Sequence, residues 1–450
     1  MAGNIDLTRG SIKKGLLSFA FPLFLGNLFQ QLYNTADSLI VGNFLGPLAL
    51  ASVSSSAPLI FMLIGFFNGV AMGAGVVISK SFGARDKEML DRAVHTDIAF
   101  GLSAGALLTV FAVLFTPVIL RLMKTPEDIM PTSSEYFRIW SWGLIFNIMY
   151  NICMGIMNAV GDSKHPLYYL IFSSVTNIVL DLLFIGVLGY GVWAAALATT
   201  VSQALSVVLS LNRLFRGNEV FKVEIRKIRF DIAVLKEIVR MGFPSGIQNS
   251  VIGFANAIVQ TNINTFTSVA VAGSGAYSKI EGFAFLPITC FSMGLMTFMG
   301  QNLGAKEYER AKKGAGFGIL TSITLAEVIG VLVFIFAPVL IALFNDDPEV
   351  VSYGTRQARM ESLFYFGLAM SHCIAGIMRG CGKAKVPMFI MMGIWCVFRV
   401  TFLTVVLSFY HRVEVIYTVY PLTWSMSSVL FLIYFFRADW IHGLEKKKVR

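Results

Sequence analysis

Long apolar runs dominate the sequence and constrain its fold more than any other feature. Twelve of these runs are long enough to cross a bilayer, which takes about 20 mostly apolar residues in an α-helix. The chain of 450 residues is 56% hydrophobic and 14% charged, an apolar share too high for a soluble domain. We therefore expect an all-α integral membrane protein with twelve transmembrane helices. The expected spans are 15–41, 52–79, 93–120, 133–159, 166–188, 190–212, 240–262, 270–298, 314–343, 355–379, 386–409 and 415–436.

The Lys and Arg residues between these spans lie mostly in alternate connections. They gather near the N-terminus, at 80–92, at 213–240, at 306–313 and in the C-terminal tail. Cytoplasmic loops carry such an excess of Lys and Arg. We therefore expect a multi-pass protein of the plasma (inner) membrane with both termini in the cytoplasm. This distribution accounts for the net charge of +10, and no nucleic-acid partner is expected.

The sequence contains an internal repeat at an offset of about 221 residues. GIMNAVGDSKHP, which starts at Gly155, corresponds to GIMRGCGKAKVP, which starts at Gly376. Each copy contains six spans, an even number, so both copies enter the membrane from the same side as parallel repeats. We expect two six-helix lobes around a central cavity. The predicted parts are an N-terminal lobe at 1–212, a cytoplasmic linker at 213–239 and a C-terminal lobe with a basic tail at 240–450.

Matched polar faces on the first and seventh spans extend this repeat. The first span carries Asn27, Asn34 and Ser38 on one helical face. Polar faces within the hydrocarbon region point to protein or to a water-filled cavity. We expect them to line the cavity, and interhelical hydrogen bonding is the alternative. The corresponding residues of the seventh span are Asn249, Asn256 and Gln260.

Two acidic residues inside spans distinguish the halves. Asp37 lies in the first span and Asp181 in the fifth, and each costs a few kcal/mol within a membrane. Their counterparts in the second half are the apolar residues Val259 and Phe402. A purely architectural pair would be expected in both halves. We therefore interpret the acidic pair as a specialised feature of the N-terminal lobe.

Two uncharged groups are expected beside this pair. Asn177 lies one helical turn before Asp181, and Thr199 lies at a similar depth in the sixth span. With Asp37 they form an oxygen-only set, which suits a hard cation such as Na⁺, and close carboxylates can also share a proton. We predict a cation-coupling site at these four residues, with a hydrogen-bonded structural cluster as the alternative.

A second candidate site is formed by Lys279 and Glu281, which lie two residues apart in the eighth span. Structural pairing explains these charges equally well. The sequence contains no P-loop, HExxH or GxSxG motif. We therefore expect no enzyme, no cofactor and no ATP-driven pump, and an ion gradient as the energy source.

Four segments of the sequence resemble multidrug and toxic compound extrusion (MATE) transporters. The resemblance is carried by FPLFLGNLFQQLYNTADSLIVGNFLG, SFGARD, GIMNAVGDSKHP and GIMRGCGKAKVP, and it covers nearly the whole chain. It implies a twelve-helix, two-lobe antiporter that exports organic, often cationic, compounds in exchange for Na⁺ or H⁺ by alternating access. It matches the cation-coupling residues above to the family's N-lobe site. The N-lobe cavity residues that it implies are Gln30, Tyr33, Asn34 and Asn151.

The resemblance is closer to the DinF-like branch than to the NorM-type branch. NorM-type members have acidic residues at positions that here read Ile252 and Leu368. The branch therefore implies coupling through the N-terminal lobe. We also expect the carrier to work as a monomer within the lipid bilayer. One alternative is a flippase for lipids or lipid-linked saccharides, whose cavity would need basic residues. An uncoupled channel or receptor is the alternative from another class.

Overall fold

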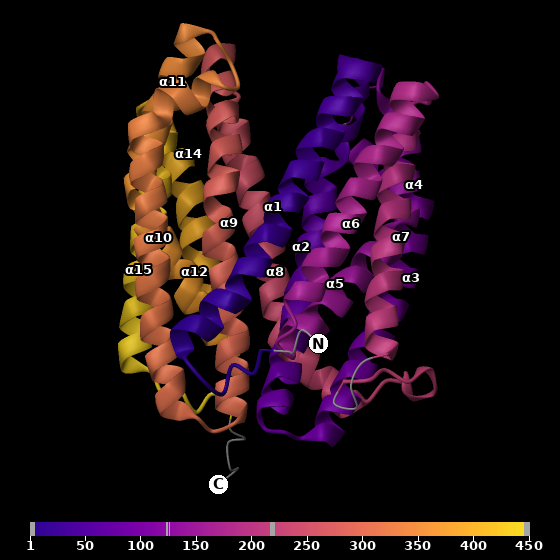
Figure 1. Ribbon diagram of the computed structural model, residues 1–450. Helices are drawn as coiled ribbons and strands as arrows, with labels where there is room; N and C mark the ends of the chain where they lie inside the picture. The colour runs from indigo at the N-terminus through magenta and orange to yellow at the C-terminus, as the bar shows by residue number, and fades with distance from the viewer. Residues whose placement is uncertain (1–4, 123–124, 126, 217–220, 445–450) are drawn as a thin grey trace. The chain divides into compact units, whose positions relative to one another are not determined.

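The computed structural model describes residues 5–122, 125, 127–216 and 221–444, and these residues are helical without any strand (Figure 1). Most of the predicted basic tail, Lys446–Lys448 and Arg450, lies outside this range. The elements of the first half are α1 (Ile12–Leu45), α2 (Pro47–Gly83), α3 (Lys87–Leu122), α4 (Met130–Trp142), α5 (Leu144–Ala159), α6 (Lys164–Asp181), η1 (Leu182–Val187), α7 (Trp193–Phe215) and η2 (Ile225–Lys227).

The second half follows with a similar succession of long helices. Its elements are α8 (Ile232–Ile263), α9 (Ser268–Gly304), α10 (Tyr308–Ala342), α11 (Pro348–Glu361), η3 (Ser362–Phe364), α12 (Tyr365–Gly380), α13 (Lys385–Met391), η4 (Met392–Phe398), α14 (Arg399–Phe409) and α15 (Val413–Arg437).

The expected all-α membrane architecture is confirmed, although the spans are less regular than predicted. Among the described residues, ten helices are long and apolar enough to cross a membrane. The count is eleven if α4 and α5, which meet at a 42° bend, form one span. The predicted span 240–262 lies within α8, which is not among them. Its polar residues, which include Gln248, Asn256 and Gln260, account for the difference.

Several predicted spans are interrupted helices. The run 166–188 consists of α6 followed by the π-helical segment η1, and 386–409 contains the π-helical segment η4 between α13 and α14. The run 355–379 is broken by the 3₁₀ segment η3. Hydropathy does not detect these breaks because they change the hydrogen-bond register and leave composition unchanged. π-Helical turns are frequent at functional sites, and here η1 follows Asp181 while η4 precedes Arg399.

The chain divides by its contacts into two compact units. Unit 1 comprises the residues up to Asp6 together with Leu25–Gly242, and unit 2 comprises Leu7–Phe24 together with the chain from Phe243 onward. The first part of α1 therefore belongs to unit 2, and the first part of α8 belongs to unit 1. The predicted linker 213–239 is also not wholly a loop, because α7 continues to Phe215 and α8 starts at Ile232.

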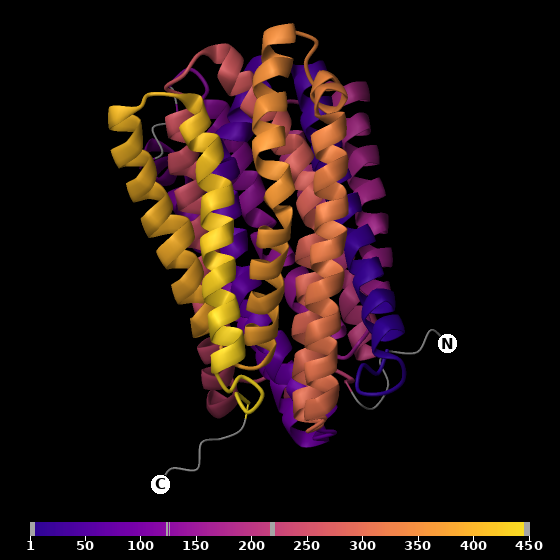
Figure 2. The same ribbon diagram turned by 90° about the vertical axis from the view of Figure 1, so that its left-hand side faces the viewer.

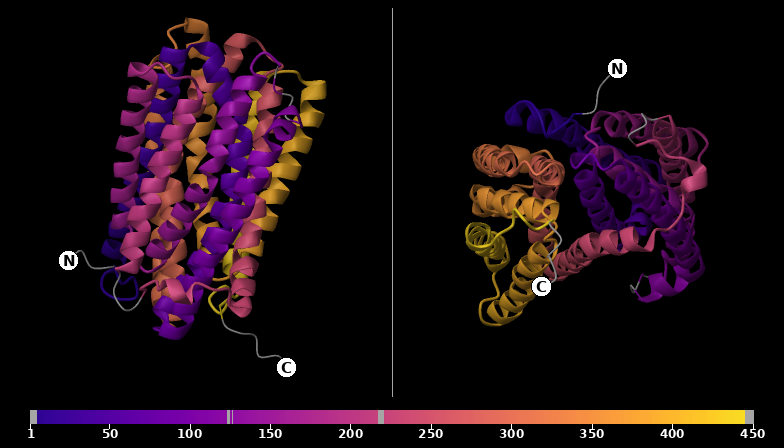
Figure 3. Two further views of the ribbon diagram at one scale, coloured as in Figure 1. Left: turned by 90° about the vertical axis from the view of Figure 1, so that its right-hand side faces the viewer. Right: turned by 90° about the horizontal axis from the view of Figure 1, so that it is seen from below.

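Within each unit the long helices run side by side. Figure 2 shows this for α10, α12, α14 and α15 of unit 2, and Figure 3 shows it for the helices of unit 1. The core of unit 1 is built from apolar faces of α2, α3, α5 and α7, with Val77, Ile98, Cys153 and Val207 among its buried residues. Apolar faces packed in this way leave polar side chains inside the unit as exceptions that need an explanation.

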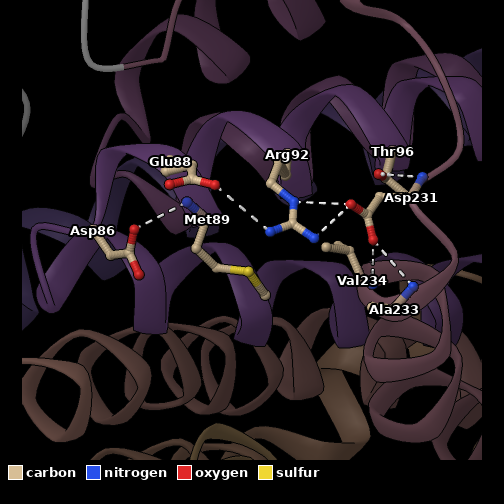
Figure 4. A network of polar contacts seen from close by, with 8 residues as sticks. All are labelled: Asp86, Glu88, Met89, Arg92, Thr96, Asp231, Ala233 and Val234. Atoms are coloured by element: carbon tan, nitrogen blue, oxygen red, sulfur yellow. Dashed lines mark hydrogen bonds and ion pairs between the residues drawn. The ribbon is translucent and has the colours of Figure 1, made fainter.

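In unit 1, the segment before α8 is fastened to α3 (Figure 4). Arg92 on α3 reaches Asp231 through Nε at 2.8 Å and through a terminal nitrogen at 2.6 Å. The backbone N–H of Asp231 donates to the Thr96 hydroxyl at 3.2 Å. Asp231 also caps α8 by accepting hydrogen bonds from the backbone N–H groups of Ala233 and Val234. The Val234 N–H, together with the Arg92 guanidinium, holds the pKa of Asp231 below its usual range.

In unit 2, the segment before α1 is fastened by Arg310 at the start of α10. Its guanidinium donates to three backbone carbonyls, those of Leu7 at 3.0 Å, Gly10 at 2.7 Å and Arg9 at 2.9 Å. Gln301 accepts the Leu7 N–H at 3.1 Å. The segment that precedes the first long helix of each repeat thus has its own polar anchor, an ion pair in unit 1 and a guanidinium–carbonyl clasp in unit 2.

Candidate functional site

The predicted acidic pair lies inside unit 1, where α1, α6 and α7 contribute polar side chains. Asp181, at the end of α6, is completely buried, and Asp37 on α1 is partly buried. Their carboxyl groups are close enough to interact electrostatically. The two helices also pack near Gly26, where an added Cβ would lie 3.5 Å from the Leu170 side chain and 3.8 Å from that of Leu167. The structure thus brings together the two acids that the sequence assigned to one site.

Asn177 and Thr199 lie together on the neighbouring helices. The Asn177 side-chain nitrogen donates to the Thr199 hydroxyl at 3.4 Å, which links α6 to α7. Asn177 is 1% exposed and lies one turn before Asp181 on the same helical face. That all four residues form one cation-coupling site stays a prediction.

Several oxygens of this group are buried without a donor among the described residues. They are both carboxylate oxygens of Asp181, Oδ1 of Asp37 and Oδ1 of Asn177. The two carboxyl groups themselves lie within hydrogen-bonding reach of each other. A buried acceptor left unsatisfied costs about 1–3 kcal/mol, and more when it is charged. Oxygens of this kind suit a proton or a hard cation. Within the described residues, no Lys or Arg side chain forms an ion pair with either acid.

Sequence reasoning missed two residues near the pair, Gln203 and Tyr136. Gln203 on α7 is 5% exposed, and its Oε1 also lacks a partner among the described residues. Tyr33 is within hydrogen-bonding reach of Gln203 and Gln30, and it lies near the charges of both acids. Tyr136 on α4 lies near the same charges. A signal for Gln203 was present, because it lies one turn after Thr199 on the same helix.

The predicted cavity residues of unit 1 are accessible or partly accessible. Asn34 is exposed, while Gln30 and Tyr33 are partly buried. Asn151 is partly buried and donates to the carbonyl of Asn147 at 2.8 Å, within its own helix. Polar side chains that remain accessible in an apolar helix bundle agree with the prediction that they line an aqueous space, which stays a prediction.

The matched residues of unit 2 lie on α8. Asn256 and Gln260 are exposed and Asn249 is partly buried. Asn256 accepts a hydrogen bond from Arg399 at 3.3 Å, and Gln260 donates to Asn264 at 2.9 Å. The predicted similarity of the two polar faces therefore extends to their exposure, while their hydrogen-bond partners differ.

The two residues of the second candidate site, Lys279 and Glu281, are close in the sequence but do not pair with each other in the described part of the chain. Lys279 is exposed. Glu281 is partly buried, and its Oε1 has no partner in the described part of the chain. Its charge acts instead on Glu361 of α11 and on Arg399 of α14. Residues two apart on a helix point in different directions, which explains why the structure separates them.

Comparison with known proteins gives the same organisation. The family model MatE matches the chain twice, over residues 22–183 and 244–405, which confirms the internal repeat. The chain is 29% identical to the "Probable multidrug resistance protein YoeA" of Bacillus subtilis, over 95% of this chain and 94% of that protein. It is 24% identical to the "Multidrug export protein MepA" of Staphylococcus saprophyticus, over 84% and 83% of the two chains.

A solved structure matches the whole fold. It is described as the outward-facing conformation of a multidrug resistance MATE family transporter of the MOP superfamily. The TM-score is 0.90 at 22% identity, over 96% of this chain and 97% of the other. At this identity the likeness shows the fold alone, and it supports the expected architecture of twelve helices in two repeated halves.

Proposed function

Because the chain belongs to the MatE family, we propose that it is a secondary active multidrug exporter that exchanges small organic compounds for H⁺ or Na⁺. The similarity to a multidrug resistance protein and to a multidrug export protein supports the export of drugs. The observation that carries the ion coupling is the buried pair Asp37–Asp181, whose oxygens lack partners within the described chain. We expect such a pair to bind a cation tightly. Binding and release of that cation would couple an ion gradient across the membrane to export.

The proposed cycle is alternating access. An ion can shift the balance between outward-open and inward-open forms only if it binds the two forms with different affinity. We place this difference at Asp37, Asn177, Asp181 and Thr199, because a small rotation of α1 against α6 would change the distance between the carboxylates. Cation binding from outside would favour the release of the exported compound, and cation release to the cytoplasm would favour its uptake.

The orientation and the remaining roles complete the proposal. Both termini lie in the cytoplasm, as the distribution of Lys and Arg implies. Gln30, Tyr33, Asn34 and Asn151 of unit 1 line the path of the exported compound, and the polar face of α8 does so in unit 2. The carrier performs no covalent chemistry, uses no cofactor and works as a monomer in the plasma membrane.

The test is efflux of a fluorescent organic cation from proteoliposomes, with Na⁺ and pH gradients imposed separately. The gradient that drives export identifies the coupling ion. Asp37→Asn and Asp181→Asn should each abolish gradient-driven export, while Asp346→Asn, which changes an exposed acid, should not. Full gradient-driven export by both unit 1 variants would overturn the coupling assignment, and movement that ignores both gradients would favour a flippase or a channel.

A further inference from the structure

The chain between α7 and α8 exposes large apolar side chains that the helices of unit 1 do not cover. We call residues 221–232 the linker segment. Within it, Ile225 is 73% exposed, Phe230 is 43% exposed and Ile232 is 60% exposed. Three such side chains in one short segment outside the apolar spans form an exposed patch, and a patch of this kind marks a surface that meets another apolar phase.

The opposite side of the linker segment is fixed to the helices of unit 1. Phe221 and Val223 are buried in the apolar core of the unit. The backbone N–H of Val223 donates to the Leu214 carbonyl at 3.0 Å, and the backbone N–H of Glu224 donates to Nε2 of His95 on α3 at 2.9 Å. The exposed apolar side chains therefore cannot turn inward without breaking these contacts.

The exposed side of the linker segment is also basic. Both of its acids are already paired, Glu224 with Lys227 at 3.1 Å and Asp231 with Arg92 at 2.6 Å (Figure 4 shows the second pair). Its exposed cations that form no ion pair within the described chain are Lys222, Arg226 and Arg229. Positive charge that the protein does not neutralise is thus available on the same side as the apolar patch.

The same surface continues onto the first turns of α8, which belong to unit 1. Lys236, Val239 and Arg240 are exposed and follow Ile232 at spacings of four, seven and eight residues. These spacings place the four side chains on one face of the helix. Apolar side chains interleaved with Lys and Arg are typical of segments that lie on the surface of an anionic membrane.

The linker segment is held near the depth of the lipid headgroups. Its polar contacts with α3 are made by Arg92, His95 and Thr96, and Figure 1 shows it beside the lower ends of α3 and α7. The first large apolar side chain that α3 exposes is Leu102, six residues after Thr96, or about 9 Å along the helix. Headgroups occupy about 5–7 Å on each side of the hydrocarbon core, so the segment lies next to them.

The corresponding segment of unit 2 has no such surface. In its described residues ahead of α1, Leu7–Ser11, Leu7 is buried and no large apolar side chain is exposed. Both segments are fastened to their units, so fastening does not require the exposed side chains. The apolar and basic surface of the linker segment is therefore an addition to the duplicated scaffold.

We propose that the linker segment is a binding surface for anionic phospholipid. The unpaired cations contact the lipid phosphates, which suit the planar donor set of arginine, and the exposed apolar side chains insert between the headgroups. An acidic protein would attract the same charges, but a segment fastened to a membrane-spanning helix at this depth meets lipid first. Only the leaflet concerned rests on the proposed orientation of the chain; the lipid binding does not depend on transport.

The test attaches a fluorescent dye to this surface in the full chain, held in lipid nanodiscs. Ile225→Cys supplies the attachment point, because the five native cysteines are buried. Spin-labelled lipids with either an anionic phosphatidylglycerol or a neutral phosphatidylcholine headgroup quench the dye where they contact it. We expect stronger quenching by the anionic lipid, and added salt should weaken this preference because it screens exposed charges.

Substitutions separate the contribution of charge from that of apolar insertion. Arg226→Gln and Arg229→Gln should each lower the preference for anionic lipid by up to about fivefold, because each removes one charge near the membrane surface. Lys313→Gln, at an exposed lysine of unit 2, is the matched control and should leave the preference unchanged. Ile232→Ser should weaken quenching by both lipids alike. If a variant fails to fold, the salt dependence of the unsubstituted surface still tests the proposal.

The other outcomes overturn the proposal. Equal quenching by the two lipids would show that the surface does not recognise charge, and no quenching by either would place the segment in water. Loss of the preference on addition of inorganic phosphate at constant ionic strength would identify a phosphate site instead. A dye response to poly-glutamate in neutral nanodiscs, without preference for anionic lipid, would identify an acidic protein as the partner. Preserved lipid preference without gradient-driven export would refute the proposed transport alone.

Discussion

The two units hold buried charges in different surroundings. In unit 1, the carboxyl groups of Asp37 and Asp181 lie within hydrogen-bonding reach of each other, and neither has an ion-pair partner in the described chain. In unit 2, the buried guanidinium of Arg399 donates to Asn256 at 3.3 Å and to Thr423 at 2.9 Å, while the buried Glu361 accepts from Gln357 at 2.9 Å. Two acids therefore approach each other in unit 1, whereas the buried charges of unit 2 are held by neutral groups.

The units also differ where the exchanged helix segments cross. In unit 1, a Cβ added at Gly73 of α2 would lie 2.2 Å from the backbone nitrogen of Gly242 on α8. In unit 2, a Cβ added at Gly294 of α9 would lie 3.6 Å from Ala20 of α1, an ordinary contact. These pairs correspond to each other in the repeat. The duplicated scaffold thus keeps its helix crossings while the tightness of each crossing is set separately.

The largest expected effect tests the acidic pair of unit 1 against the corresponding position of unit 2. Asp181→Asn should lower gradient-driven export about a hundredfold or more, because the remaining pair can no longer bind a cation with high affinity. Phe402→Leu, at the counterpart in unit 2, should leave most of the export. The measurement is initial efflux rate in proteoliposomes at matched protein content. Equal losses in both variants would indicate that the unit 1 site has no special role.

The second prediction tests the helix crossings. Gly73→Ala should destabilise the protein by about 1–3 kcal/mol or more, because the new methyl group meets backbone that cannot move aside like a side chain. Gly294→Ala should cost little, and Gly75→Ala, where nothing lies within 4 Å, serves as the control on the same helix. Thermal unfolding in detergent measures the difference. Its readout is the fraction of the monodisperse peak that remains after heating. Similar shifts for Gly73→Ala and Gly294→Ala would contradict the asymmetry.

The third prediction compares the two anchors. Arg310→Lys should cost about 1–2 kcal/mol, because an ammonium cannot keep the planar set of three hydrogen bonds to the carbonyls of Leu7, Arg9 and Gly10. Arg92→Lys should cost less, since a single charge can still reach Asp231. Limited proteolysis ahead of α1 and ahead of α8 would measure each anchor. The prediction would be contradicted if Arg92→Lys increased cleavage ahead of α8 more than Arg310→Lys increased cleavage ahead of α1.

The smallest effect concerns pH. The pKa of Asp231 is lowered in the folded protein by the Val234 N–H and by Arg92. Its contribution to stability is therefore present above the usual carboxyl pKa and is lost as the pH falls through the lowered value. Asp231→Asn should make the segment before α8 less dependent on acid, as measured by hydrogen exchange of residues 221–234. An unchanged acid dependence would exclude Asp231 as its source.

A large part of the candidate site could be predicted from single helices. The helical period places Asn177 one turn before Asp181, and the cost of charge in an apolar span marks Asp37 and Asp181 as special. The structure brings Asp37 close to Asp181 and joins Asn177 to Thr199. Gln203 was missed because an amide in an apolar helix carries little cost by itself and became informative only beside the acids.

The buried charges of unit 2 could not be predicted in the same way. Glu281 was grouped with Lys279 because they are neighbours in the sequence, but they point in different directions on α9. Glu361 ends a helix whose other charges are exposed, and Arg399 lies beyond a π-helical turn that shifts the register of everything after it. Each step depends on the rotation of one helix against another.

The sequence by itself determined that the chain is a helical membrane protein, duplicated within itself, with two costly acids in its first half. These properties depend on composition and on short-range periodicity, which one chain segment expresses alone. Only the tertiary structure decided that the first parts of α1 and α8 belong to the opposite units. It also decided that Glu361 and Arg399 are buried in unit 2. Such pairings follow from how helices pack and rotate about their axes, and side chains from several distant segments fix that packing together.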